Sequence, residues 1–193
     1  EHAHELEREE GRTYVHAFDD ETVMAGQGTI GLEIYEDLPG VDTVVVPIGG
    51  GGLISGIATA LKGKDERIRV VGVQAEGASS VVESLEKGHR IERDSVETIA
   101  DGIATRTVGE KTFEVISERV DEVVTVSDSE IAVALTTLLE RSKTLAEGAG
   151  AVALAAVMEA KFDFEDDETI VPALCGGNID LNTLTNVIMR GLV

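Results

Sequence analysis

The chain has 193 residues, of which 42% are hydrophobic and 27% charged, so it can fold as one domain with a sizeable core and is too apolar to be disordered. Its 37 acidic and 16 basic residues give a net charge of −21, which disfavours nucleic acid and anionic membranes as partners. The acidic residues are scattered along the chain, which indicates a solvated acidic surface of the kind that proteins of salt-loving organisms carry; an acidic patch for a partner is the alternative.

The sequence carries no signal for export or membrane insertion. No apolar run is long enough to span a bilayer, and the first residues lack the basic-then-apolar pattern of a signal peptide. The single cysteine, Cys175, excludes an internal disulfide and fits a reducing compartment. We therefore expect a cytoplasmic protein.

The first part of the chain predicts two helices joined by a short strand. The first helix ends at Gly11, and residues 13–16 form the strand. Acidic residues at 19–21 begin the second helix, where the helix dipole favours them, and this helix continues to about Leu38. Each glycine inside a helix costs about 1 kcal/mol relative to alanine, so the internal glycines predict close backbone packing. These glycines are Gly26, Gly28 and Gly31.

The middle and the end of the chain alternate between apolar strands and helices. The predicted strands are residues 43–48, 68–73, 120–126 and 169–174. The predicted helices are residues 53–62, 78–88, 107–117, 127–145, 150–161 and a last helix with Leu181, Leu184, Val187, Ile188 and Leu192 on one side. Ser127 and Glu130 form a capping box. Alternation of this kind with fully apolar strands predicts an α/β fold: a parallel sheet whose strands are buried by helices on both faces.

Two glycine-rich turns follow predicted strands, at 49–52 and at 176–177. Ligands of parallel α/β sheets bind at the carboxyl ends of the strands, so both turns could face one site. Glycines at a strand-to-helix junction let backbone N–H groups approach an anion closely, and Gly49–Gly52 therefore indicate a phosphate site; a flexible tight turn is the alternative. Leu53 and Ile54 stand where a nucleotide P-loop needs Lys and Ser or Thr, and the glycine spacing of a dinucleotide fingerprint is also absent. These patterns favour a terminal phosphomonoester.

Six stretches, in order, resemble fold-type-II pyridoxal-phosphate enzymes and in particular the threonine/serine dehydratases. The most extensive is residues 44–56, a valine-rich strand followed by Gly49–Gly52 and Leu-Ile-Ser-Gly. The others are residues 18–20, 25–29, 99–104, 147–151 and 175–178. The resemblance covers nearly the whole chain and implies the large domain of such an enzyme, in incomplete form, with pyridoxal 5'-phosphate as cofactor and a small amino acid as substrate.

The resemblance also assigns cofactor contacts. It implies that Gly49, Gly50, Gly51, Gly52 and Leu53 hold the cofactor phosphate, and that Cys175, followed by Gly176, faces the pyridine nitrogen. A neutral thiol cannot keep that nitrogen protonated, which favours elimination over transamination. A lone cysteine after a buried strand is otherwise a small core residue.

Two acidic residues are the candidate catalytic groups. The resemblance places Glu147 close to the cofactor ring and Asp101 on the substrate side; a surface carboxylate and an ordinary Asp-Gly turn are the respective alternatives. We expect Asn178 to cap the last helix. Glu76 matches the first cation ligand of related serine racemases, but Val82 stands at the second ligand position, six residues later, so we expect no metal site. The histidines lack zinc-ligand spacing.

The lysine that holds the cofactor in this family matches none of the lysines in the sequence. We expect it upstream of Glu1, so the 193 residues are a carboxy-terminal fragment of the catalytic domain and inactive alone; a regulatory domain can follow. The complete enzyme would convert threonine or serine to a 2-oxo acid and ammonia as a homo-oligomer, with isoleucine biosynthesis as a possible context. A serine racemase or another β-eliminating enzyme of this fold, a non-catalytic phosphate-binding fragment and a nicotinamide-binding domain are the alternatives.

Overall fold

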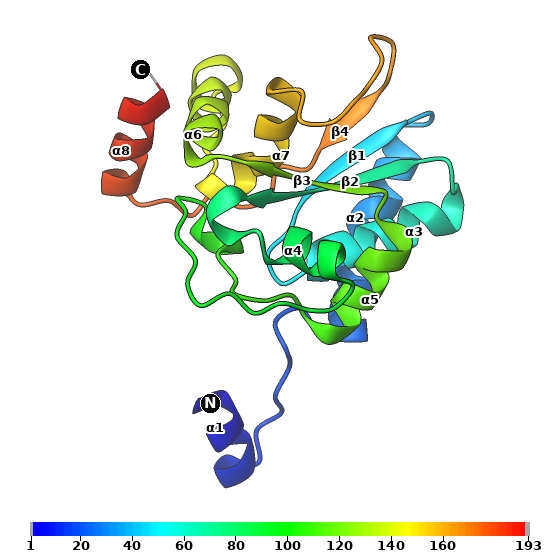
Figure 1. Ribbon diagram of the computed structural model, residues 1–193, viewed down its shortest axis with the longest axis vertical. Helices are drawn as coiled ribbons and strands as arrows, with labels where there is room; N and C mark the ends of the chain where they lie inside the picture. The colour runs from blue at the N-terminus through cyan, green and yellow to red at the C-terminus, as the bar shows by residue number, and fades with distance from the viewer. Residues whose placement is uncertain (1, 192–193) are drawn as a thin grey trace.

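The structure, a computed structural model, describes residues 2–191 and is built around a four-stranded parallel sheet (Figure 1). The strand order is β3-β2-β1-β4. The strands are β1 (Thr43–Pro47), β2 (Arg69–Ala75), β3 (Glu122–Val126) and β4 (Ile170–Pro172). The predicted parallel α/β fold is confirmed.

Burial differs between the central and the edge strands. All residues of β1 and nearly all of β2 are buried, as their β-branched sequences predict. Residues of β3 and β4 are mostly only partly buried, so the prediction of full burial is wrong for these two strands. The reason is position: each has a neighbour on one side only. Pro172 fits this place because proline cannot donate to a strand ladder.

Helices cover both faces of the sheet (Figure 1). Of the helices, α2, α3, α4 and α5 lie on one side, and α6, α7 and α8 lie on the other. Their bounds are α2 (Glu21–Asp37), α3 (Gly52–Lys64), α4 (Ser80–Lys87), α5 (Glu110–Arg119), α6 (Asp128–Thr137), α7 (Gly148–Met158) and α8 (Leu181–Gly191). Short 3-10 turns, η1 (Glu76–Ala78) and η2 (Asp101–Ile103), complete the connections.

Helices α2 and α3 approach each other closely through glycine. A Cβ on Gly28 would lie 3.1 Å from Gly56 O, and a Cβ on Gly31 would lie 3.0 Å from Ile57 O. The predicted packing role is therefore confirmed for Gly28 and Gly31. It is wrong for Gly26, which has nothing within 4 Å of an added Cβ.

The capping box that begins α6 is confirmed, because Ser127 and Glu130 each accept the other's backbone N–H. The helix ends earlier than predicted. A π-helical turn, η3 (Leu138–Ser142), follows α6, and Lys143 then takes a left-handed conformation with φ 57. Leu192, predicted for the last helix, lies outside the described residues.

Helix α1 (His2–Glu10) stands away from the sheet and its helices (Figure 1). Gly11 ends it with φ +65, as predicted. The strand predicted at residues 13–16 is wrong, because this segment has no pairing partner in the described part of the chain. None of the helices described is long and apolar enough to cross a membrane.

Candidate active site

The two glycine-rich turns lie side by side at one edge of the sheet. Strands β1 and β4 are parallel neighbours, with Val45 opposite Pro172. The pairing continues past β4, where Ala173 N–H donates to Val45 O at 2.8 Å. The turn at 49–52 and the turn at 175–177 therefore both leave the carboxyl edge. This juxtaposition is what a single ligand touching both turns requires.

The turn after β1 presents unsatisfied donors. Within residues 2–191, no acceptor bonds the backbone N–H groups of residues 49–54, although Gly50, Gly51 and Gly52 are buried. The carbonyls, in contrast, are bonded: Gly51 O accepts the N–H of Ser55 at 3.0 Å. Buried N–H groups without a partner are costly, so this turn is arranged for an acceptor from outside the chain. Since α3 begins here, its positive end favours an anion.

Steric crowding explains why this turn consists of glycine. A Cβ on Gly50 would lie 2.3 Å from the Phe18 ring, and a Cβ on Gly49 would lie 3.0 Å from Ile103 Cα. Gly51 has φ +93, a conformation that other residues rarely adopt. Any side chain here would be strained or would collide with Phe18, Ile103 or Thr112.

Glu147 forms the other side of the site, at the N-terminus of α7. Its Oε2 accepts the N–H of Asn178 at 2.9 Å, and its own N–H donates to Gly176 O at 3.3 Å. A Cβ on Gly102 would lie 2.9 Å from Glu147 Oε1. The carboxylate therefore lies between the Asp101–Gly102 turn and the Cys175–Gly176 turn, and the predicted residues of this side come together.

Asp101 is exposed, and its Oδ1 accepts the N–H of Gly102 at 2.9 Å. The expectation that Asn178 caps α8 is wrong. Asp180 does so, because its Oδ1 accepts the N–H groups of Asn182 at 2.9 Å and Thr183 at 3.1 Å. Asn178 instead uses its backbone N–H to bind Glu147, which ties the turn after β4 to α7.

Burial, and secondarily the negative charge of Glu147, raises the pKa of the Cys175 thiol above its ordinary value. Both causes disfavour the thiolate. The thiol is therefore neutral, and because Cys175 is only partly buried, a small molecule can still reach it. A neutral thiol can donate or accept a weak hydrogen bond, but it cannot act as a carboxylate would toward a ring nitrogen.

From the sequence alone we did not identify the residues that fix the glycine turn through its carbonyl groups. Thr112 Oγ1 donates to Gly50 O at 2.8 Å, and Asp19 accepts N–H groups from the first turn of α5. The Phe18-Asp19-Asp20 stretch was part of the family resemblance, but the resemblance assigned it no role in the site. Nothing in the sequence links Thr112 to a turn 62 residues away.

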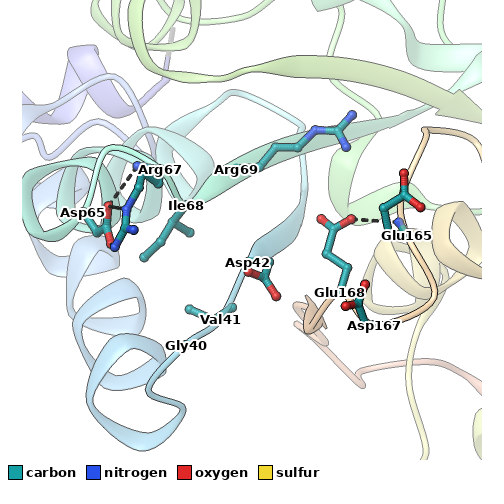
Figure 2. Close-up of a pocket in the computed structure, with 10 residues that line it drawn as sticks. All are labelled: Gly40, Val41, Asp42, Asp65, Arg67, Ile68, Arg69, Glu165, Asp167 and Glu168. Carbon is teal, nitrogen blue, oxygen red and sulfur yellow. Dashed lines mark hydrogen bonds and ion pairs between the residues drawn. The ribbon is translucent and has the colours of Figure 1, made fainter.

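A cavity of about 710 Å³ lies at the opposite, amino edge of the sheet (Figure 2). It is lined by Gly40, Val41, Asp42, Asp65, Arg67, Ile68, Arg69, Glu165, Asp167 and Glu168. Figure 2 shows Arg67 turned onto Asp65, at 2.7 Å, rather than into the cavity. None of the predicted site residues lines this cavity.

The sequence profile of the pyridoxal-phosphate dependent enzymes matches residues 1–176 of the chain. The chain belongs to this family. Its cofactor is pyridoxal phosphate, and the family resemblance inferred from the six motifs is confirmed.

Individual relatives place the chain more closely within the pyridoxal-phosphate dependent enzymes. An L-threonine ammonia-lyase of Thermotoga maritima is 47% identical over 97% of this chain and 46% of its own length. The processed form of threonine deaminase isoform 2 from Solanum lycopersicum superposes with a TM-score of 0.92 at 37% identity, over 100% of this chain and 56% of that one. Maize serine racemase gives a TM-score of 0.89 at 35% identity, over 98% and 58%. The chain thus spans about half the length of these relatives.

The residues present at the carboxyl edge fit the family's cofactor. The buried N–H groups of the glycine turn suit a phosphate, because no acceptor within the described residues bonds them. Across the same edge, the neutral Cys175 thiol suits a pyridine nitrogen. Lys111, the lysine closest in sequence to Thr112, pairs with Glu21 at 2.7 Å and is engaged elsewhere.

Proposed function

We propose that this chain is the phosphate-binding and ring-binding part of the catalytic domain of a threonine/serine ammonia-lyase. The complete protein converts L-threonine to 2-oxobutanoate and ammonia, and L-serine to pyruvate and ammonia. The observation that carries the proposal is the juxtaposition of unpaired N–H groups after β1 with a neutral thiol after β4, the neighbouring strand.

In this proposal each wall of the site binds one part of the cofactor. The N–H groups of Gly49–Gly52 and Leu53 donate to the phosphate, aided by the positive end of α3. Cys175 and Gly176 contact the ring edge. When bound, pyridoxal phosphate withdraws electrons from the substrate's α-carbon, which makes loss of the α-proton and the β-hydroxyl possible.

We propose that Glu147 acts beside the cofactor ring and Asp101 on the substrate side. Glu147 orients the turn that carries Cys175, because it accepts the Asn178 N–H. Burial raises the pKa of the thiol, and the negative charge of Glu147 adds a smaller increase. A protonated thiol leaves the ring nitrogen uncharged, which weakens electron withdrawal and favours elimination over transamination. Asp101 is exposed beside Gly102, where it can contact an incoming amino acid.

Further parts of the proposal concern the complete protein. The lysine that attaches the cofactor belongs to the part of the relatives' length that this chain does not span. The 193 residues alone are then inactive, and the complete enzyme works in the cytoplasm as a homo-oligomer. Isoleucine biosynthesis is one context in which 2-oxobutanoate is used.

The test is product analysis of the complete protein loaded with pyridoxal phosphate. L-threonine should give 2-oxobutanoate and ammonia in equal amounts, measured by reduction of the 2-oxo acid with a coupled dehydrogenase and by an ammonia assay. The 193-residue chain should give neither product. Absence of 2-oxobutanoate from the complete, cofactor-loaded protein would refute the proposal.

Racemisation of serine is a second candidate, supported by the likeness to maize serine racemase. Val82 shares a pocket with Glu76 and Lys161, and it offers no oxygen ligand for a cation beside that glutamate. This arrangement favours the ammonia-lyase. Chiral chromatography of L-serine reactions decides: D-serine as the main product would favour the racemase.

A further inference from the structure

The peptide between Gly50 and Gly51 is fixed by a helix that lies outside the glycine turn. Gly50 O accepts Thr112 Oγ1 at 2.8 Å and the N–H of Gly109 at 3.2 Å. We propose that Thr112, supported by Asp19, is a positioning residue that aims the anion-binding N–H groups of the turn. This inference rests on the phosphate site proposed above.

The contact to the Gly50 carbonyl also fixes the direction of the Gly51 N–H, because both belong to one planar peptide. All peptide bonds in the described residues are trans, so the N–H of Gly51 points opposite to the C=O of Gly50. Two donors hold that carbonyl on the side of α5, and the N–H is therefore held on the other side. The next peptide is fixed in the same way, because Gly51 O accepts the N–H of Ser55 at 3.0 Å. Both N–H groups are thus aimed before any ligand arrives.

Thr112 uses all of its polar groups in this connection. It is fully buried, its hydroxyl binds Gly50 O, and its own carbonyl accepts Ser55 Oγ at 3.3 Å. Its N–H donates to Asp19 Oδ1 at 3.2 Å. Thr112 therefore joins the turn, the first turn of α3 and the first turn of α5.

Asp19 fixes the helix that carries Thr112. Helix α5 begins after Gly109, which has no side chain to cap it. Asp19 supplies the cap, since it accepts the N–H groups of Glu110 at 3.0 Å and Lys111 at 2.9 Å in addition to that of Thr112. Without this carboxylate, the first turn of α5 would be free to fray, and the Thr112 hydroxyl would lose its fixed position.

A purely structural role and a positioning role predict different responses to an anion. If Thr112 only stabilises the fold, its removal lowers the free energy of unfolding and leaves phosphate affinity unchanged. If it aims the N–H groups, affinity falls in a chain that is still folded. Preorganised donors bind an anion more tightly because no reorientation is needed on binding.

The experiment is a titration of the complete protein, freed of pyridoxal phosphate and ¹⁵N-labelled at glycine, with inorganic phosphate, followed through the backbone amide signals of Gly51 and Gly52. Thr112→Val removes the hydroxyl at constant shape, and Thr112→Ser retains it. Thr136→Val is the matched control, because the Thr136 hydroxyl bonds Ala132 O within its own helix. Circular dichroism and urea unfolding show whether each variant is folded.

For Thr112→Val we expect the phosphate dissociation constant to rise by roughly tenfold, the equivalent of one lost buried hydrogen bond. Thr112→Ser and Thr136→Val should keep the affinity of the unchanged chain. Asp19→Ala should also raise the phosphate dissociation constant, whereas Asp20→Ala should leave it unchanged. Asp20 is its matched control because it caps α2, where it accepts the N–H groups of Thr22 and Val23.

The outcomes separate this inference from the proposed function. Phosphate binding that survives Thr112→Val unchanged overturns the positioning role and leaves the phosphate site standing. Failure of the unchanged chain to shift its Gly51 and Gly52 signals overturns both the site and the positioning role. If Thr136→Val lowers the phosphate affinity as much as Thr112→Val does, the positioning role is overturned, because the effect is then not specific to the Gly50 contact.

Discussion

The two edges of the sheet contrast in how their polar groups are satisfied. At the amino edge, a cavity of about 710 Å³ is rich in charged side chains, and most of these bond to neighbouring groups. Arg69 donates to Asp163 O at 2.5 Å, and Asp42 Oδ2 accepts the N–H of Thr169 at 2.8 Å. At the carboxyl edge, the buried N–H groups of the glycine turn have no acceptor in the described residues. Unsatisfied donors, rather than cavity volume, therefore place the proposed ligand site at the carboxyl edge.

Two glycines with the same backbone conformation test this contrast most strongly. Gly51 at the carboxyl edge has φ +93, and Gly40 at the amino edge has φ +90. A Cβ on Gly51 would lie 2.8 Å from the Thr112 side chain, whereas one on Gly40 meets nothing within 4 Å. Gly51→Ala should therefore lower the free energy of unfolding by about 3 kcal/mol, the sum of backbone strain and overpacking. Gly40→Ala should cost about 1 kcal/mol, from strain alone.

Urea unfolding of both variants measures the difference, and phosphate titration adds a functional readout. Gly51→Ala should also abolish the phosphate response, while Gly40→Ala should retain it. Equal destabilisation by the two substitutions would show that the turn after β1 is not tightly packed, contrary to the structure.

Substitutions at the amino edge should lower the free energy of unfolding without changing the phosphate affinity. Arg69 donates to Asp163 O, pairs with Glu122 at 2.5 Å and lies 5.4 Å from the centre of the Phe162 ring. Its side chain is 30% exposed, so Arg69→Ala should cost about 1–2 kcal/mol of unfolding free energy, with no change in phosphate affinity. Arg67→Ala is the control, since that side chain is 90% exposed and its replacement should leave the urea midpoint unchanged. A weaker phosphate affinity in Arg69→Ala would contradict the separation of the two edges.

The smallest expected effect concerns the thiol at the carboxyl edge. Burial is the larger cause of the raised Cys175 pKa, and Glu147 is the smaller one. Glu147→Gln removes only the charge, so the pKa should fall but stay above its ordinary value. Because the thiolate is the nucleophile, alkylation by iodoacetamide should be faster at a given mildly alkaline pH, and its pH profile should move to lower pH.

Mass spectrometry of the alkylated chain gives the rate at each pH. Glu33→Gln, an exposed change on α2, is the control and should leave the profile in place. An unchanged profile in Glu147→Gln would mean that its carboxylate does not act on Cys175.

Local sequence patterns predicted most of the helices and strands. They failed where contacts with segments distant in the sequence determine whether an element forms or where it begins. The β-branched run before Gly49 gave the buried strand β1, and Ser127 with Glu130 gave the start of α6. Residues 13–16 have strand-forming side chains but no strand beside them, so no strand forms. At α8 the sequence predicted Asn178 as the cap. The backbone N–H of Asn178 instead bonds Glu147, and Asp180 caps the helix, which only the path of this turn decides.

Within the candidate site, the sequence by itself determined the chemistry of each turn. Glycines after an apolar strand present N–H groups because they lack side chains, and this depends on adjacent residues only. Tertiary structure alone decided that β1 and β4 are neighbours and that Asp19 reaches α5 across 91 to 93 residues. Such contacts depend on how the chain packs as a whole, and no local pattern encodes which distant hydroxyl will hold the carbonyl of Gly50.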